Sequence, residues 1–140
     1  MSNNNHMHCP FCSNLGSLDL VYANDTAAVA LHEDWAVRGH AMVIAKQHVE
    51  NLSELDEPER FLRVYREAER VMLRLTGADR AVILKLGIVT PHLHLHIYPV
   101  RASLDRAAVM DIINGRVHVE RDPSFVNDVR AALDSALGGE

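Results

Sequence analysis

The feature that most restricts the fold of this chain is a histidine alternation in residues 90–100, TPHLHLHIYPV. Histidines and aliphatic residues take turns there, in the order His92, Leu93, His94, Leu95, His96 and Ile97. A period of two predicts a β-strand, because successive side chains of a strand point to opposite faces of the sheet. We therefore expect one face of this strand to lie in the core and the other to present the imidazoles. Imidazoles titrate near neutral pH, bind metals and contact phosphate.

Three interpretations of this imidazole face are open. It could be a solvated surface, although three of the nine histidines falling within five residues argue against that. It could bind a catalytic Zn²⁺ if the side chains converge, since neighbouring Cα atoms on one face lie about 7 Å apart. Alternatively, one imidazole could act as a nucleophile while its neighbours hold an anionic substrate.

The composition is that of an ordinary globular protein. Of the 140 residues, 48% are hydrophobic and 24% are charged, which is enough chain for one domain with its own core. No apolar run approaches the ~20 residues of a membrane span, so we expect a cytoplasmic protein without membrane association. The net charge of −5 argues against binding to a nucleic acid polymer. We expect residues 1–8 to be a disordered or tag-derived segment, with Met7 as a candidate natural start, ahead of a single domain at 9–140.

The remaining segments predict an α+β fold. Strands are expected on both sides of a turn at Asn24 and Asp25, over Ala41–Ala45, over residues 80–87 and 90–100, and at an edge over residues 116–120. Helices are expected from an N-cap at Asp56 to Gly77, over residues 104–113, and from Asp122 onward. The first of these helices carries one buried stripe at helical spacing, made of Phe61, Tyr65, Ala68, Met72 and Leu75. Strands in pairs without β-α-β alternation indicate an antiparallel sheet.

Cys9 and Cys12 form a C-x-x-C pair. In a reducing compartment this spacing indicates a metal site, or redox chemistry where a β-α-β unit follows, and no such unit follows here. Two ligands alone do not make a structural zinc site, so two idle buried thiols are the alternative.

A second segment carries a family resemblance together with the histidine strand. It reads GHAMVIAKQHVENLSELD, residues 39–56, and is followed by a helix, a strand and the alternating histidines. This combination resembles the histidine triad (HIT) superfamily, and within it the bacterial hydrolase-like branch, from about Cys9 to Arg101. The resemblance implies a HIT-like fold with a five-stranded antiparallel sheet and two or three helices. It also implies a homodimer in which two sheets join into one of ten strands.

The resemblance further implies a reaction and a zinc site. HIT proteins hydrolyse or transfer nucleotides through attack of a histidine on an α-phosphate, which gives a nucleotidyl-histidine that water resolves. On this chain the nucleophile would be His94, with His96 at the phosphate and leaving group and with His92 and His40 completing the cluster. Substrates of that kind are dinucleoside polyphosphates and nucleoside phosphoramidate-like compounds. A structural Zn²⁺ would be held by Cys9, Cys12, His48 and His92, an assignment that takes His92 away from direct chemistry.

The chain departs from the family pattern around the expected substrate. His32 stands where the family usually has Asp or Asn for the ribose hydroxyls, and Ile88 stands where Gln or Asn is common. Lys85 stands near a position where the family often has Asn and could supply a positive charge instead. Arg38 and Arg101 flank the expected site and could hold a phosphate. A catalytically weak nucleotide- and zinc-binding regulatory module is therefore the alternative function. A mononuclear zinc hydrolase is less favoured, because the strand lacks a carboxylate base.

Overall fold

The computed structural model describes residues 9–138 and contains one five-stranded sheet. The strands are β1 (Asp19–Ala23), β2 (Ala27–Leu31), β3 (Ala41–Ala45), β4 (Arg80–Leu84) and β5 (His94–Val100). Their order across the sheet is β1-β2-β3-β5-β4, and all neighbours are antiparallel. The α+β class and the five-stranded antiparallel sheet predicted from the sequence are therefore confirmed.

The hairpin at the start of the sheet has the predicted turn. The side-chain oxygen of Asn24 accepts hydrogen bonds from the main-chain nitrogens of Thr26 and Ala27, at 2.8 and 2.9 Å. Such a side-chain-to-backbone turn is a common use of asparagine between two strands. The hairpin's second strand, β2, and its neighbour β3 are buried along their whole length, because both faces of the sheet are covered there.

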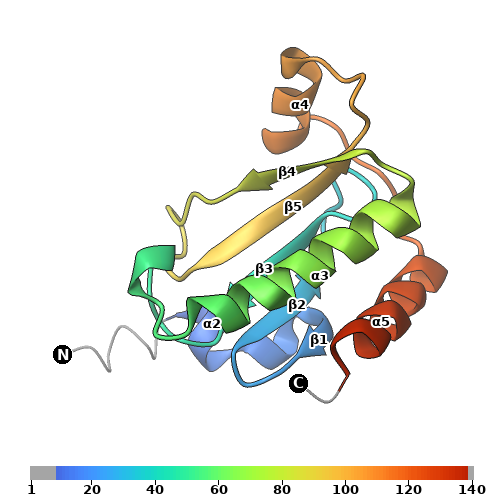
Figure 1. The fold of residues 1–140 in the computed structure, drawn as a ribbon. Coiled ribbons are helices and arrows are strands. Elements are labelled where there is room, and N and C mark those ends of the chain that lie inside the picture. The colour runs from blue at the N-terminus through green and yellow to red at the C-terminus, as the bar shows by residue number, and fades with distance from the viewer. Residues whose placement is uncertain (1–8, 139–140) are drawn as a thin grey trace.

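Two helices cover one face of the sheet. Figure 1 shows α3 (Pro58–Thr76) lying across the strands with α5 (Pro123–Leu137) beside it at the β1 edge. The predicted stripe of α3 enters the core, where Phe61, Tyr65, Ala68 and Met72 are buried and Leu75 is partly buried. The N-cap of α3 is Glu57 and not Asp56 as predicted, because Pro58 occupies the first helical turn. Gly77 ends the helix with a φ of +73°, a left-handed conformation that favours glycine.

On the opposite face, the described residues form two covers, one at each end. At one end α2 (Pro10–Ser13) and the 3₁₀ turn Leu15–Ser17 bring Phe11 and Leu15 against Met42 and Ile44. At the other end α4 (Arg106–Ile113) places Ile112 on Tyr98 and Val100. A second 3₁₀ turn, Leu52–Glu54, follows β3 in the chain. The space between the two covers exposes the histidine side of β5.

Two sequence predictions about strands are wrong. Residues 116–120 form no strand. Their main-chain hydrogen bonds run from Arg116 N to the carbonyl of Asp111 and from Val119 N to the carbonyl of Trp35. The alternation of valine with polar residues there reflects an exposed connection, not a half-buried strand. Strand β4 also ends at Leu84, three residues earlier than predicted. The predicted N-terminal segment, residues 1–8, lies outside the described residues, and no helix in the described part of the chain could cross a membrane.

Candidate functional site

His94 is the first residue of β5, and its ring is fixed by the main chain. Its Nδ1–H donates to the carbonyl oxygen of His92 at 2.7 Å, and the edge of Phe11 packs against the ring with centroids 4.7 Å apart. A neutral imidazole that donates through Nδ1 carries its free lone pair on Nε2. Burial lowers the pKa of His94 below its usual value of 6.5, so that the neutral form prevails at pH 7. His94 thus presents an unprotonated Nε2.

His96 and His40 meet across the sheet. Strand β3 begins just after His40 and pairs with β5, and this brings Nε2 of His40 to 3.0 Å from Nδ1 of His96. Burial, followed by the neighbouring imidazoles of His32 and His96, lowers the pKa of His40 to about 3. Burial, followed by His94 and His32, lowers the pKa of His96 to about 4. Both rings are therefore neutral at pH 7, and one donates a hydrogen bond to the other.

His32 and Tyr98 extend this imidazole cluster. His32, which follows β2, stacks on His40 with centroids 4.4 Å apart and ring planes within 5° of each other. Tyr98 stacks on the ring of His40 with centroids 4.2 Å apart. A cavity of about 400 Å³ opens over these rings and is further lined by Asp34, Ala36, Ile112, Ile113, Gly115, Val117 and His118.

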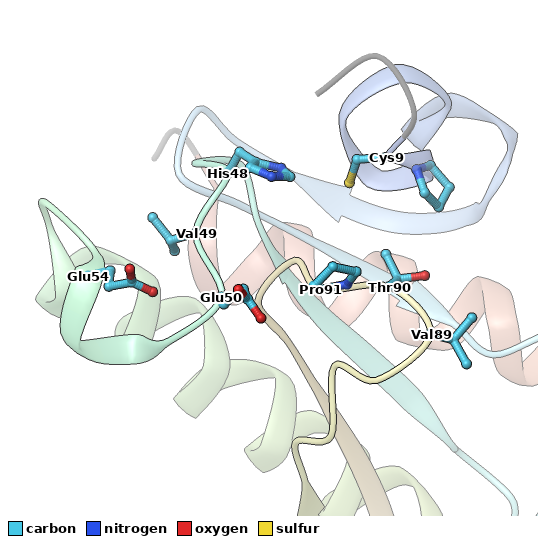
Figure 2. A pocket seen from close by; sticks show the side chains of 9 residues that line it. Cys9, His48, Val49, Glu50, Glu54, Val89, Thr90 and Pro91 are labelled. Atoms are coloured by element: carbon cyan, nitrogen blue, oxygen red, sulfur yellow. The ribbon is translucent and has the colours of Figure 1, made fainter. Parts of the chain in front are cut away.

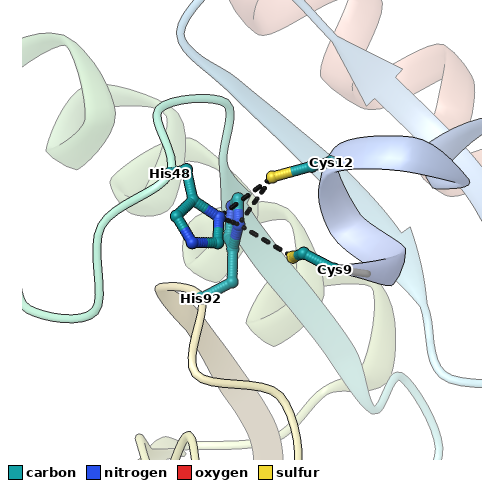
Figure 3. A group of neighbouring side chains, drawn as sticks. All are labelled: Cys9, Cys12, His48 and His92. Atoms are coloured by element: carbon teal, nitrogen blue, oxygen red, sulfur yellow. Dashed lines mark hydrogen bonds between the residues drawn. The ribbon is translucent and has the colours of Figure 1, made fainter. Parts of the chain in front are cut away.

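Four side chains from three separate segments form a second cluster, shown in Figure 3. These are Cys9, Cys12, His48 and His92, whose ligand atoms all lie within 4.8 Å of one another. The Sγ atom of Cys12 lies 3.0 Å from Nδ1 of His48, and that nitrogen lies 3.1 Å from Nδ1 of His92. The Sγ atom of Cys9 lies 3.3 Å from the same nitrogen of His92. A Cys₂His₂ set at this spacing fits a tetrahedral zinc ion, whose ligands converge from about 2.0–2.3 Å.

His92 does not continue the row formed by His94 and His96. Strand β5 begins at His94, and the ring of His92 is only 1% exposed and turned toward the cysteines. Its Nε2–H donates to the carbonyl oxygen of Ala45 at 2.6 Å, which leaves Nδ1 for a metal. The prediction of a single face of three imidazoles therefore holds for His94 and His96 only. The structure places His92 among the zinc-ligand candidates and not at the open face.

A larger cavity of about 490 Å³ lies beside the Cys₂His₂ cluster (Figure 2). Cys9 and His48 line one side of it, and Glu50 and Glu54 line the other. Its remaining lining residues are Pro10, Val49, Val89, Thr90 and Pro91. Two carboxylates and the absence of the β5 histidines from this lining make the cavity unsuited to a phosphate.

The other predicted substrate residues do not join the imidazole cluster. Lys85 and Ile88 lie in the exposed connection between β4 and β5, and the side chain of Ile88 is 79% exposed. The positive charge of Lys85 contributes to the lowered pKa of His94, after burial. Arg101 follows the other end of β5, seven residues from His94, or about 23 Å at 3.3 Å per residue. His32 alone of these four residues lies against the cluster.

Two residues of the site were missed by the sequence prediction. Tyr98 continues the alternation of His94 and His96 by one more step, so the period of two already placed it on the same face. Phe11 comes from the N-terminal segment and packs on both His92 and His94. Its position depends on the folding of the C-x-x-C segment onto the sheet, and no local pattern predicts that contact.

Comparison with known families settles the relationship that the geometry suggests. The family model described as the HIT domain matches residues 17–103, more than half of the chain. This chain belongs to the HIT family. The match covers all five strands and α3, and ends before α4 and α5.

Solved structures of HIT proteins share the fold. A hypothetical histidine triad nucleotide-binding protein from Sulfolobus tokodaii superposes with a TM-score of 0.65 at 22% identity, over 92% of this chain and 91% of that one. A Zn-bound histidine triad family protein from Mycobacterium smegmatis gives 0.58 at 24% identity, over 96% and 99%. A HIT family hydrolase from Clostridium thermocellum gives 0.56 at 18% identity, over 71% and 96%.

Proposed function

We propose that this protein is a HIT-type nucleotide hydrolase or transferase that attacks an α-phosphate with His94. The proposal rests chiefly on one observation, the 2.7 Å hydrogen bond from Nδ1 of His94 to the carbonyl of His92. This bond holds the tautomer whose Nε2 is a nucleophile and aims that nitrogen away from the main chain. Because burial keeps the ring neutral at pH 7, no deprotonation step precedes attack.

The neighbouring histidines are proposed to bind the phosphate. As neutral imidazoles, His96 and His40 have one N–H each, and the hydrogen bond between them uses one of the two. With His40 donating from Nε2 to Nδ1 of His96, the Nε2–H of His96 remains for an equatorial phosphate oxygen that gains negative charge in the transition state. His96 is also the donor nearest to a leaving group, since its ring centroid lies 5.2 Å from that of His94. His92 is proposed to act only as a zinc ligand whose carbonyl orients His94.

The proposed reaction has two balanced steps. In the first, the lone pair on Nε2 of His94 forms a bond to the α-phosphorus while the bond from phosphorus to the leaving atom breaks. The leaving group departs with that electron pair and takes a proton from water, while the N–H of neutral His96 stabilises it by donating a hydrogen bond. In the second, water attacks the same phosphorus and loses a proton to solvent. The N–P bond breaks, its electron pair returns to Nε2 of His94, and a nucleoside monophosphate leaves. The proposed substrates are dinucleoside polyphosphates and nucleoside phosphoramidate-like compounds, a class in line with the nucleotide-binding protein from Sulfolobus tokodaii and the hydrolase from Clostridium thermocellum.

A catalytically weak regulatory module is the second candidate. It is favoured by the exposed Ile88, which offers no hydrogen bond to a leaving group, and by His32, whose imidazole can accept only one hydrogen bond from a ribose. Such a module would bind nucleotide and zinc with little turnover. The intact His94 and His96 favour the enzyme.

Structural zinc in the Cys₂His₂ cluster is part of the proposal. The ion would tie the N-terminal segment that carries Cys9 and Cys12 to His48 after β3 and to His92 before β5. The zinc in the histidine triad protein from Mycobacterium smegmatis is in line with this role. Thiol ligands of this kind are maintained in a reducing compartment, so we also propose a cytoplasmic location.

A homodimer is also proposed, with β4 as the joining edge. Among residues 9–138, strand β4 lies at the end of the sheet order and pairs with β5 on one side only. Its neighbourhood exposes a group of aliphatic side chains, namely Ile83, Leu86, Ile88 and Val89 at 50%, 58%, 79% and 95%. An unpaired edge beside an apolar patch is a surface that a second copy can cover, and antiparallel pairing of two such edges gives ten strands.

The covalent intermediate is the decisive test of the proposed chemistry. Protein quenched during turnover of a dinucleoside polyphosphate or a nucleoside phosphoramidate should gain the mass of one nucleotide. His94→Asn should lose both the adduct and the turnover, whereas His96→Asn should still form the adduct but more slowly. Wild-type turnover in His94→Asn would disprove the assignment, and nucleotide binding without turnover in the unmodified protein would support the regulatory module instead.

A further inference from the structure

The imidazole cluster contains a second group of side chains with the spacing of metal ligands. One nitrogen from each of His32, His40 and His96 lies within 4.8 Å of the corresponding nitrogens of the other two. The separation required between two imidazole nitrogens on a tetrahedral zinc ion is about 3.4 Å, given Zn–N bonds of about 2.0–2.1 Å. The pair His40 Nε2 and His96 Nδ1, at 3.0 Å, already comes close to that separation. This group shares no residue with the Cys₂His₂ cluster.

We propose that His32, His40 and His96 form a second metal site, which binds a divalent transition-metal ion of the kind that prefers imidazole ligands. The three nitrogens come from separate segments: the residue after β2, the residue before β3, and β5 itself. The sheet therefore holds the three backbone positions near one another. Three imidazoles without a carboxylate suit Zn²⁺, Co²⁺, Ni²⁺ or Cu²⁺ rather than Mg²⁺ or Ca²⁺.

The surroundings orient the three rings, as the hydrogen-bond partners of metal ligands do in metalloproteins. Nδ1 of His32 lies 3.0 Å from the carbonyl oxygen of Asp34 and 3.2 Å from its main-chain nitrogen. In the tautomer that donates from Nδ1 to this carbonyl, Nε2 is left for an ion. Tyr98 stacks on His40 and holds its plane. Burial keeps His40 and His96 neutral at pH 7, and the neutral imidazole is the form that binds metals.

One ring must turn before an ion can bind. His32 and His40 are stacked with nearly parallel planes, so their in-plane lone pairs do not meet at a point. His32 is partly exposed and can rotate about its Cβ–Cγ bond, a torsion with a broad energy profile. The cavity of about 400 Å³ over the three rings gives an ion access and leaves room for water as a fourth ligand. An ion there would occupy His96 and so inhibit the hydrolysis, a consequence that, unlike the binding itself, rests on the proposed function.

The test is a Co²⁺ titration of zinc-loaded protein without nucleotide, so its result does not depend on the proposed hydrolysis. We expect one Co²⁺ per chain in addition to zinc, with d–d absorption and without the thiolate charge-transfer band that the Cys₂His₂ cluster would give. His32→Asn and His96→Asn should weaken this binding at least tenfold, about the loss that follows even removal of a ligand's hydrogen-bond partner. His94→Asn removes an imidazole from the same face but not from the site, and should bind Co²⁺ as the unmodified protein does.

Retained zinc and an unchanged circular dichroism spectrum show that each variant is folded. His32→Gln provides a second variant at a partly exposed ligand. Any of three results would overturn the proposal. The protein could fail to bind Co²⁺, the Co²⁺ could displace zinc and give thiolate bands, or binding could survive both His32→Asn and His96→Asn.

Discussion

Acid should destabilise this protein through the buried imidazoles of His40 and His96. Both have pKa values below the 6.5 of a free imidazole, at about 3 and about 4, because burial disfavours the charged form. On unfolding each ring regains its ordinary pKa, so between these values the unfolded chain binds more protons than the folded one. The stability contributed by the neutral rings is thus complete well above pH 6.5, and it is lost as the pH falls.

The size of the effect follows from proton linkage. Between pH 7.5 and pH 5 the unfolded imidazole becomes almost fully protonated, while folded His40 and His96 remain largely neutral. Protonation of each imidazole in the unfolded chain therefore lowers the free energy of unfolding by about 2 kcal/mol over this interval. For the two residues together the loss is about 4 kcal/mol. That is a large share of the 5–15 kcal/mol typical of a domain. With a urea dependence of about 2 kcal/mol per molar, the unfolding midpoint should fall by about 2 M.

The measurement is a series of urea unfolding curves, followed by circular dichroism, at pH values from 7.5 to 5. His40→Asn and His96→Asn each remove one of the two rings, so each should remove about half of the acid loss attributed to the pair. Zinc release at low pH affects all variants alike and cancels in the differences between them. A pH dependence unchanged in both His40→Asn and His96→Asn would refute the reasoning.

Three further predictions concern the zinc cluster, the sheet edge and the reaction rate. Cys12→Ser should lower the zinc content, measured by elemental analysis, from about one per chain toward zero. It should also lower the unfolding temperature, measured by calorimetry. Full zinc content in this variant would contradict the Cys₂His₂ assignment. In analytical ultracentrifugation, Ile83→Lys should convert a dimer to a monomer, because the new charge lies beside the β4 edge. Met110→Lys, at an exposed apolar residue elsewhere, should leave the dimer intact. Equal masses for the two variants would argue against dimerisation through β4. The hydrolysis rate should fall only below about pH 6.5, as His94 becomes protonated with its lowered pKa, and an acid limb centred above pH 7 would contradict that assignment.

Local patterns in the sequence determined the elements of the sheet and its main helix. The turn at Asn24 needs only its own side chain and the main-chain nitrogens of Thr26 and Ala27. Likewise, α3 is determined by apolar spacing between Pro58 and Gly77. Period-two and helical patterns are reliable here because one face of each element is buried. Where nothing is buried, as at residues 116–120, the same alternation predicted a strand that does not form.

The tertiary structure decided how the histidines divide. His92 and His94 are two positions apart in one pattern, yet one ring faces the cysteines and the other the open face, because β5 starts between them and the carbonyl of Ala45 captures His92. The meeting of His40 with His96 depends on the pairing of β3 with β5, and the stacking of His32 on His40 follows from the end of β2 beside them. Contacts such as that between His40 and His96, which are 56 residues apart, depend on strand order and register, which no local pattern encodes. The sequence therefore determined which residue types could do chemistry, and the fold decided which of them meet.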